Sequence, residues 1–504
     1  MSIDIATGEK KDCGKVVDGR LGASFWFFVD KDSNLWFTLW KRNYSYENDF
    51  GNLYCYNPEA DSIKTYDNVL PMGQLIDGTP VSEARNEQRA WTWLSPFPGR
   101  DKCYFIQGTL GGGDERLWIF DPSKDIVSGE AFEPVAYIGS SYFETAVGGD
   151  RLYFCTHLSN YWKEGIEAYP GAHVFGYEMA TGTFRDFGIV KERYSIYSAI
   201  AVDPVLKKLY VFSVPFVPEL YKSDGCHLMS IDIATGEKKD CGKVVDGRLG
   251  ASFWFFVDKD SNVWFTLWKR NYSYENDFGN LYCYNPEADS ITTFDNVLPK
   301  GELIDGTPVS ETRNEQRAWT WLSPFPGRDK CYFIQGTLGG GDERLWIFDP
   351  SKDIVSGEAF EPVAYIGSSY FETAVGGDRL YFCQYEDLED ARTIFSEDER
   401  EIDPASPEYV ERKIHLRSIS LAEGGLNREI KDHGPLVDQD GHAALMIMSM
   451  AADNDGHVFV YGSWRPNSFK EATLQYLLFE YPNGDLYRLL KRGEFFAVIN
   501  TNED

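Results

Sequence analysis

The amino-acid sequence predicts an all-β protein of β-propeller architecture. A unit of about 50 residues recurs along the chain, and each unit contains four short apolar runs separated by polar turns. Aromatic residues make up 15% of the 504 residues, and 46 glycines and 23 prolines provide turn positions. Four short strands at this period are typical of a propeller blade, which buries its faces by stacking on its neighbours. An array of β-sandwiches is the alternative fold.

Each repeated unit has two halves, and both read as hairpins. The first half is an apolar run, a polar turn and a second apolar run, as in "SFWFFVDKDSNVWFTLW" (252–268) and "SAIAVDPVLKKLYVFSV" (198–214). Asp, Asn, Gly and Pro fill the turns, as expected for hairpin connections. The second half, such as "HVFGYEMATGTFRDFG" (173–188), predicts two further strands around a tight turn.

The apolar runs define the expected blades. We place them at 20–67, 88–139, 141–190, 193–245, 248–296, 316–367, 369–437 and 442–493, and residues 1–17 read as the outer half of another blade. Seven blades over 88–493 are favoured, because residues 156–504 alone supply most of such a ring. Residues 1–87 then form an extra arm, a half-blade plus one blade; alternatively, eight blades close. We therefore expect a propeller in 88–504 that carries the functional site.

The chain also contains a long internal duplication that spans several of these repeated units. Residues 1–155 recur as residues 229–383 without a gap, at an offset of 228. Six positions differ: Leu35/Val263, Lys64/Thr292, Tyr66/Phe294, Met72/Lys300, Gln74/Glu302 and Ala84/Thr312. The exact register indicates a recent duplication of four blades. The copies diverge after Cys155 and Cys383, so the segment that begins at Thr156 occurs once.

Composition limits the classes of partner. The formal net charge is −30 and no Lys/Arg-rich run is present, so we expect no nucleic-acid partner. No apolar run reaches about 18 residues, so we expect no membrane span. No signal peptide is recognisable, but Met1 corresponds to the internal Met229. We expect a secreted or periplasmic protein if the N-terminus is truncated and a cytoplasmic one otherwise. The sequence does not predict an oligomeric state.

The nine cysteines reduce to five kinds of position. Eight of them are four positions present in both copies, and Cys226 is single. Most lie in strand-like contexts such as "NLYCYN", and no CxxC motif occurs. We expect buried thiols, not a disulfide framework or a zinc site.

The unduplicated stretch "YFCTHLSNYWKEGIEAYPGAHVFGYE" (153–178) contains the main catalytic candidates. His157 is expected to end the second strand of its blade and His173 to begin the third. Strand end and strand start are neighbours in an antiparallel blade, so the two imidazoles are expected at one rim. The loop between them holds Tyr161 and Trp162, an aromatic platform suited to a sugar. Two capped surface histidines are the alternative.

The next blade supplies further candidates. His227, in "DGCHLMSID", occupies the same place in its blade as His173, and a repeated structural role is its alternative interpretation. Arg193, Tyr194 and Tyr197, in "ERYSIYSAIAVDP", lead into the innermost strand.

Arginines at innermost-strand entries are suited to a carboxylate ligand. Arg248, in "DGRLGASFWFF", is placed to clamp a carboxylate with two hydrogen bonds, and Arg270 competes for the same role. An inter-blade salt bridge is the alternative. Because three histidines lie in adjacent blades, a metal ion bound by them is a further alternative, although no ligand spacing points to one.

The pattern "LYFCTH…YPGAHVFGYEMATGTFRDFGIV…YSIYSAIAVDPVLKKLYVFSVP…CHLMSIDIATGEKKDCGKV" resembles bacterial β-propeller polysaccharide lyases, notably ulvan lyases. Oligogalacturonate lyases are a more distant comparison. The resemblance is best over 141–270. It implies β-elimination on a uronic-acid-containing polysaccharide, and hence an anionic polysaccharide as partner.

The resemblance also implies roles for individual residues. A cation neutralises the uronate carboxylate, a base takes the C5 proton and an acid protonates the leaving oxygen at C4. The resemblance assigns acid and base to His157, His173 and Tyr197, and the neutralising cation to Arg248. Substrate contacts are expected from Tyr161, Trp162, Arg193, Tyr194, His227 and Arg270. A non-catalytic carbohydrate- or protein-binding propeller is the alternative function. Because the later copy carries Gln384 and Tyr385 after Cys383, we expect at most one active centre.

Overall fold

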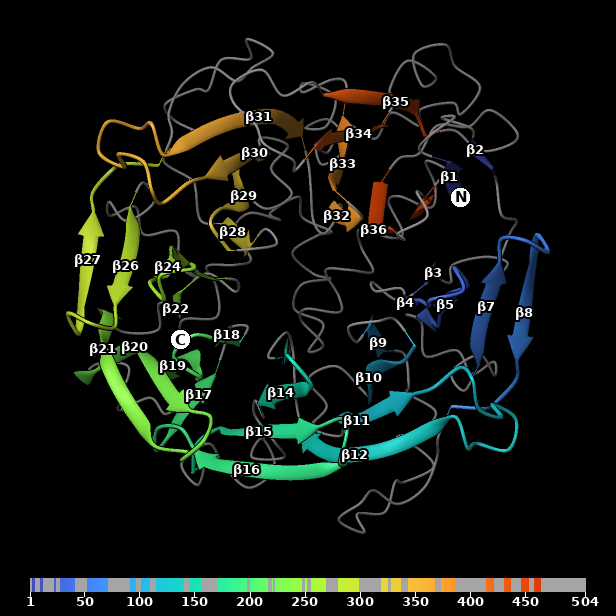
Figure 1. The fold of residues 1–504 in the computed structure, drawn as a ribbon, viewed down its shortest axis with the longest axis horizontal. Helices are drawn as coiled ribbons and strands as arrows, with labels where there is room; N and C mark the ends of the chain where they lie inside the picture. The colour runs from blue at the N-terminus through green and yellow to red at the C-terminus, as the bar shows by residue number, and fades with distance from the viewer. Residues whose placement is uncertain are drawn as a thin grey trace, which may run out of the picture. The chain divides into compact units, whose positions relative to one another are not determined.

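The computed structural model describes the segments that contain the strands and their turns. These are residues 2–4, 10–11, 22–23, 28–40, 52–70, 91–96, 101–108, 115–139, 145–155, 170–196, 200–215, 220, 223–246, 250–251, 255–268, 280–298, 319–324, 328–336, 343–367, 373–376, 378–385, 414–420, 430–436, 446–452 and 457–463. The secondary-structure elements within them are β-strands (Figure 1), apart from residues 220 and 223, which are helical. No helix in these segments is long and apolar enough to cross a membrane.

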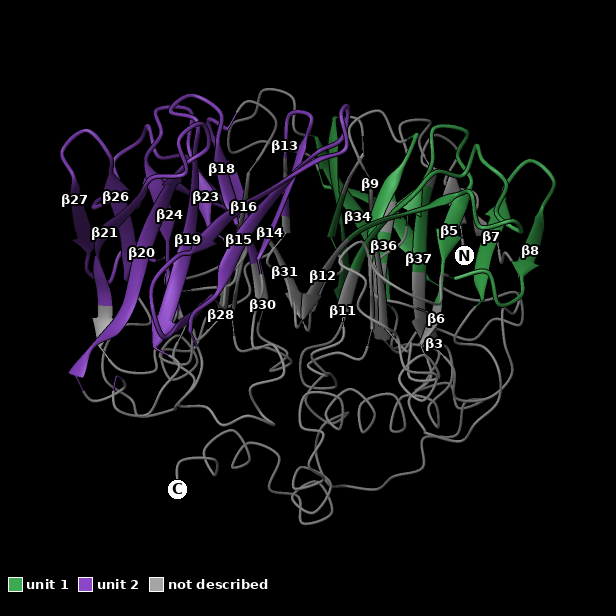
Figure 2. Ribbon diagram, turned by 90° about the horizontal axis from the view of Figure 1, so that it is seen from below, with its two compact units in different colours: residues 1–109, 116–137, 366–504 green, residues 110–115, 138–365 purple. Residues whose placement is uncertain are grey.

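The chain divides into two compact units, which Figure 2 colours separately. Unit 1 comprises residues 1–109, 116–137 and 366–504, and unit 2 comprises residues 110–115 and 138–365.

Unit 1 contains four antiparallel blade-type sheets. The first sheet consists of β4 (Phe28–Val29), β5 (Leu35–Phe37), β7 (Leu53–Asn57) and β8 (Ser62–Tyr66). The second consists of β9 (Trp91–Pro96), β10 (Cys103–Gly108), β11 (Glu115–Phe120) and β12 (Phe132–Gly139). The third consists of β32 (Thr373–Gly376), β33 (Arg379–Tyr385), β34 (Ile414–Ser420) and β35 (Lys431–Pro435), and the fourth of β36 (Met446–Ala452), β37 (His457–Ser463), β1 (Ser2–Asp4) and β2 (Lys10–Lys11). A short pair, β3 (Gly22–Ala23) and β6 (Leu39–Trp40), accompanies the first sheet.

Unit 2 also contains four such sheets. The first sheet consists of β13 (Thr145–Gly148), β14 (Arg151–Cys155), β15 (His173–Glu178) and β16 (Thr183–Ile189). The second consists of β17 (Tyr194–Ile196), β18 (Ala201–Asp203), β19 (Lys208–Pro215), β20 (Gly225–Asp232) and β21 (Lys238–Asp246). The third consists of β23 (Phe256–Val257), β24 (Val263–Phe265), β26 (Leu281–Asn285) and β27 (Ser290–Phe294), and the fourth of β28 (Trp319–Pro324), β29 (Cys331–Gly336), β30 (Glu343–Phe348) and β31 (Phe360–Gly367). The short pair here is β22 (Gly250–Ala251) and β25 (Leu267–Trp268).

These sheets confirm the predicted all-β propeller fold. In each sheet the strands follow one another as an antiparallel meander, which is the topology of a propeller blade. Within the described residues, seven of these blade-type sheets have four strands. The eighth, β17–β21, has five, because its first strand is split into β17 and β18, which both pair with β19.

One sheet joins the two ends of the sequence. β1 pairs with β37 through Ser2 and Phe459, Ile3 and Val458, and Asp4 and His457. The N-terminal half-blade predicted at 1–17 therefore completes the sheet that β36 and β37 begin. The strands predicted at 477–493 lie outside the described residues, and the division at residue 87 stays a prediction.

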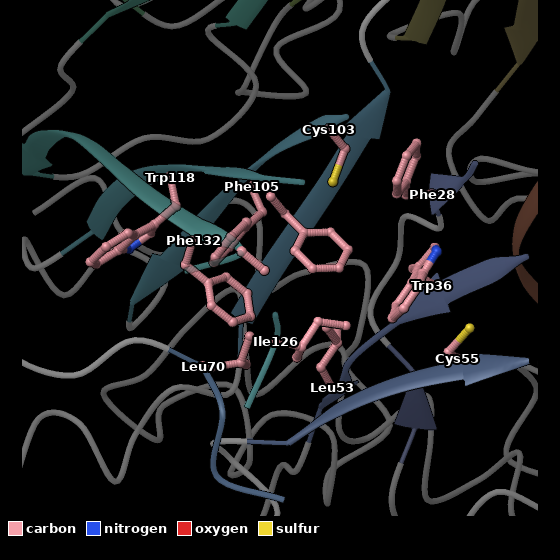
Figure 3. Close-up of a cluster of buried hydrophobic side chains, with 12 residues drawn as sticks. Phe28, Trp36, Leu53, Cys55, Leu70, Cys103, Phe105, Trp118, Ile126 and Phe132 are labelled. Atoms are coloured by element: carbon pink, nitrogen blue, oxygen red, sulfur yellow. The ribbon is translucent and has the colours of Figure 1, made fainter. Parts of the chain in front are cut away.

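Aromatic side chains pack neighbouring sheets of unit 1 together (Figure 3). Trp36 lies on β5 and Phe105, Trp118 and Phe132 come from the β9–β12 sheet, and all are buried in one cluster. The Trp36 ring meets Phe120 edge to face, with ring centroids 5.0 Å apart. The second copy repeats this packing in unit 2, where Trp264 and Phe348 are 5.1 Å apart. The duplication has thus copied inter-blade packing as well as strands.

The two sheets of unit 2 that carry the described candidates pack face to face. Val174 and Phe187 of the β13–β16 sheet share a buried cluster with Leu209, Met229 and Ile231 of the β17–β21 sheet. Side chains alternate between the faces of a strand. His173 therefore lies on the face of β15 opposite Val174, whereas His227 lies on the same face of β20 as Met229.

The cysteines behave as the sequence predicts. All eight described cysteines are free thiols and are buried. Burial raises the pKa of Cys103 and Cys331 well above the usual range, and it raises the pKa of Cys55 and Cys283 to about 12. Such thiols stay protonated and are poor nucleophiles and poor metal ligands at neutral pH.

Candidate functional site

Four of the predicted site residues lie in the described part of unit 2. They are His173, Arg193, Tyr194 and His227. The other six, His157, Tyr161, Trp162, Tyr197, Arg248 and Arg270, lie outside the described residues, and their roles stay predictions. The expectations that His173 begins the third strand of its blade and that Tyr194 enters the innermost strand of the next are confirmed.

His173 forms a histidine–carboxylate pair with Asp186 of the neighbouring strand β16. Its Nδ1 lies 3.1 Å from both carboxylate oxygens, and a third (33%) of the side chain is exposed. The pairing of β15 with β16 shifts register just after His173. The Asp186 carboxylate also accepts a hydrogen bond of 2.6 Å from the backbone amide of Gly188. Gly188 has a φ of 80°, which glycine adopts readily. In a neutral ring whose Nδ1–H donates to Asp186, Nε2 is the basic nitrogen.

His227 stands between two carboxylates. Its Nδ1 lies 3.0 Å from Asp240 and its Nε2 lies 2.8 Å from Asp224, and only 11% of the side chain is exposed. Only the doubly protonated imidazolium donates from both nitrogens. This ring therefore bridges the two carboxylates, with one ring nitrogen at each.

Tyr194 and Lys191 complete a cluster around His227. The Tyr194 hydroxyl donates a short hydrogen bond to Asp224, and its ring meets the His227 ring edge to face. The Lys191 ammonium lies 2.9 Å from Asp240 and 4.6 Å from the centre of the Tyr194 ring. Two carboxylates thus face the Lys191 ammonium and the two ring nitrogens of His227.

The contacts in the cluster lower the pKa values of its two aspartates and raise the pKa of its tyrosine. Although burial acts to raise it, hydrogen bonds from His227 and Tyr194 hold the pKa of Asp224 well below its usual range. The pKa of Asp240 is also lowered, because hydrogen bonds from Lys191 and His227 outweigh burial. Burial and the Asp224 carboxylate together raise the pKa of Tyr194. The cluster therefore keeps its carboxylates ionised and its phenol protonated.

Backbone hydrogen bonds tie this cluster to the start of β15. The amide of Ala172 donates to the Tyr194 carbonyl, and the amide of Arg193 donates to the Pro170 carbonyl, both at 2.9 Å. The amide of Val190 donates to the Ala172 carbonyl at 2.9 Å. His173 and the His227 cluster are thus brought to the same end of two neighbouring sheets, as the sequence predicts for these two positions.

A third pair of the same kind occurs in unit 1, and sequence reasoning missed it. His415 on β34 places its Nδ1 3.0 and 2.9 Å from the two carboxylate oxygens of Asp432 on β35. As in the other sheets, the carboxylate accepts the amide of a positive-φ glycine two residues later, here Gly434. The histidine–carboxylate pair is therefore a recurrent feature of this protein's blades.

Sequence reasoning also missed the carboxylate partners. They are Asp186, Asp224, Asp240 and Asp432, together with Lys191. A spacing signal was present, since His173 and Asp186, like His227 and Asp240, lie 13 residues apart and Asp is followed by x-Gly. Among the described residues, no group of three or more His, Cys, Asp or Glu side chains is arranged to hold a metal ion.

Comparisons with known proteins show similarity in structure alone. No protein-family model matches the sequence, and no curated protein matches it. Oligogalacturonate lyase from Vibrio parahaemolyticus is 13% identical, with 86% of this chain and 92% of that chain covered and a TM-score of 0.40. An oligogalacturonate lyase in complex with manganese is 13% identical over 73% and 87% of the two chains, with a TM-score of 0.38.

The β-propeller domain of the Trilobed protease from Pyrococcus furiosus is also similar in structure. It is 12% identical over 82% of this chain and 98% of that chain, with a TM-score of 0.41. Proteins of different activities thus appear at the same low level of similarity, so these matches carry no argument about what this chain does.

Proposed function

We propose that this protein is a polysaccharide lyase that cleaves a uronic-acid-containing polysaccharide by β-elimination. The observation that carries the proposal is the His173–Asp186 pair. Its histidine is one-third exposed, lies at the start of a strand, and follows the single-copy loop that contains His157 and the aromatic residues. The resemblance of the sequence to ulvan lyases implies that histidines of this kind act at the reacting carbons.

The reaction suits an imidazole held by a carboxylate. The base takes the C5 proton, the electrons of the C–H bond form the C4=C5 double bond, and the C4–O bond breaks. The leaving oxygen takes a proton from an acid. We assign the base to His173, since Asp186 fixes the ring through Nδ1 and stabilises the imidazolium that forms. His157 or Tyr197 then acts as acid, and Arg248 neutralises the uronate carboxylate.

The other described histidine takes a different part in this proposal. His227 is largely buried and both its nitrogens face carboxylates, which leaves it no nitrogen for proton transfer to a substrate. We therefore assign it to the support of the site. Tyr194 is only 3% exposed, and we assign it in the same way.

A non-catalytic, carbohydrate-binding propeller is the second candidate function. The recurrence of the histidine–carboxylate pair in three sheets favours it, because a feature common to several blades can serve blade folding alone. In that case His173 contributes to stability without reacting.

One assay separates the two functions. The purified full chain is incubated with ulvan, glucuronan and polygalacturonate, and the ultraviolet absorbance of the unsaturated uronate product is followed. We expect an absorbance rise with at least one polymer and its loss in His157→Ala. A folded protein that gives no rise with any of the three, yet binds one of them in a titration, supports the binding function and contradicts the lyase.

A further inference from the structure

The segment that leads into His173 is fastened to the segment that leads into the next sheet. Residues 170–172 and 190–194 are joined by the three backbone hydrogen bonds of Ala172, Val190 and Arg193, each 2.9 Å long. Tyr194 donates its own amide to the Lys191 carbonyl at 3.2 Å. The position of His173 therefore depends on where residues 190–194 lie.

Residues 190–194 are in turn held by side chains. Tyr194, the first residue of β17, donates its hydroxyl to Asp224 just before β20, and Lys191 reaches Asp240 on β21. These two side-chain contacts add to the backbone pairing of Tyr194 with Pro215. His227 bridges the two carboxylates and fixes them relative to each other. A continuous chain of hydrogen bonds thus runs from the sheet, through Tyr194 and Lys191, to the backbone beside His173.

Gly171 is an independent sign that this junction is tightly built. Its φ is +132°, and a Cβ placed on it would lie 2.6 Å from the Lys191 carbonyl oxygen and 2.6 Å from Cγ2 of Ile189. Real Cβ contacts are not that short. The Gly171-Ala172-His173 sequence therefore requires glycine because two backbone segments approach closely.

We propose that Tyr194, Asp224 and His227 are positioning residues that hold the start of β15, and with it His173, in place for catalysis. The catalytic part of this inference rests on the proposed lyase function; the anchoring part does not. Loss of the anchor displaces His173, which acts in the transition state, so we expect it to lower kcat more than it raises KM.

The test compares Tyr194→Phe with Tyr284→Phe in the full chain. Tyr284 is a matched control in the same unit, since it is buried and donates its hydroxyl to Asp289 at 3.0 Å. Amide hydrogen exchange is followed by mass spectrometry in peptides that cover residues 170–174 and 190–194. We expect exchange of the Ala172, Val190 and Arg193 amides to become about tenfold faster in Tyr194→Phe only.

The second measurement is the kinetics of product formation on the polymer that the wild type cleaves. We expect Tyr194→Phe to lower kcat about tenfold with KM nearly unchanged, and Tyr284→Phe to leave both near wild type. If Tyr194→Phe does not fold, Lys191→Met removes the other side-chain tether and carries the same two measurements.

Each outcome decides the inference. Equal exchange in the two variants overturns the anchor. Faster exchange in Tyr194→Phe with unchanged kcat overturns the positioning role in catalysis. If the wild type cleaves no polymer, the lyase proposal fails, and the exchange result still supports or overturns the anchor by itself.

Discussion

The His173–Asp186 pair of unit 2 and the His415–Asp432 pair of unit 1 share one geometry in two settings. In both, Nδ1 faces a carboxylate on the next strand, and a positive-φ glycine fixes that carboxylate. The exposed fraction differs: 33% of the His173 side chain is exposed, against 12% for His415. The pair itself is thus part of blade construction, and any special function must come from what surrounds it.

The surroundings differ in their charges. Asp432 also lies 3.4 Å from the Arg417 guanidinium, which in turn donates a short hydrogen bond to Gln384. This second donor draws the carboxylate charge away from His415. On β15, Phe175 stands at the position that Arg417 has on β34, and the nearby Lys191 contacts Asp240, so Asp186 accepts hydrogen bonds from His173 and the Gly188 amide. His173 is therefore the candidate base of the two, because its carboxylate partner is not shared with an arginine.

The largest effect is expected from filling the space beside His173. Gly171→Ala combines an unfavourable φ with two severe contacts, so we expect a loss of about 3 kcal/mol in the free energy of unfolding. Gly182→Ala is the control, because Gly182 also has a positive φ (68°) but its nearest atom, the Tyr177 hydroxyl, is 3.7 Å away. Its loss should be about 1 kcal/mol.

Urea denaturation of both glycine variants measures these losses. A lysine, Lys413, stands two residues before His415, where Gly171 stands two residues before His173. Equal losses in the two variants would show that the junction is not tightly packed, and the distinction between the two sites would weaken.

The next effect concerns the carboxylates of the two pairs. Asp186→Asn keeps the size of the side chain but removes the charge that stabilises the imidazolium, so kcat of the lyase reaction should fall about 10²-fold. Asp432→Asn makes the same change at the His415 pair and should leave kcat within about twofold, since Asp432 has no part in the proposed chemistry. Steady-state kinetics on the cleaved polymer measures both. Parallel losses would mean that the pair acts through stability.

A smaller effect is the acid dependence of the His227 cluster. The folded-state pKa of Asp224 lies below its unfolded value, so its contribution to stability is present above about pH 4 and is lost as the pH falls through the folded pKa. The stability gap between wild type and Asp224→Asn should therefore be constant at neutral pH and narrow below about pH 4. Urea titrations at several pH values measure the gap. A gap that widens in acid would show that Asp224 is not held ionised by its hydrogen bonds.

The fold was predictable because its signals are local. The predicted blade at 141–190 contains β13–β16, and the one at 193–245 matches β17–β21 to within one residue at each end, since hairpin turns and apolar runs mark strands directly. The pairing of β1 with β37 depends on residues more than 450 positions apart, and no local pattern reveals which half-blades meet.

The site was predictable only in part. His173 and His227 were found because histidine is rare in this chain and the two occupy equivalent blade positions. Their carboxylate partners were not, because Asp186 and Asp240 lie on outer strands in a sequence with 79 acidic residues, where one more aspartate looks like solvated surface. Spacing across a blade, read together with the Asp-x-Gly turn, identifies such partners.

The most direct test of His173 as the catalytic base compares His173→Ala with His415→Ala. The rate at which each full-length variant forms unsaturated uronate is measured on the polymer that the wild type cleaves. We expect a loss of at least 10²-fold for His173→Ala and a rate within about twofold of wild type for His415→Ala, although both variants lose the same kind of histidine–carboxylate pair. Equal rates in the two folded variants would contradict the assignment of His173 as the base.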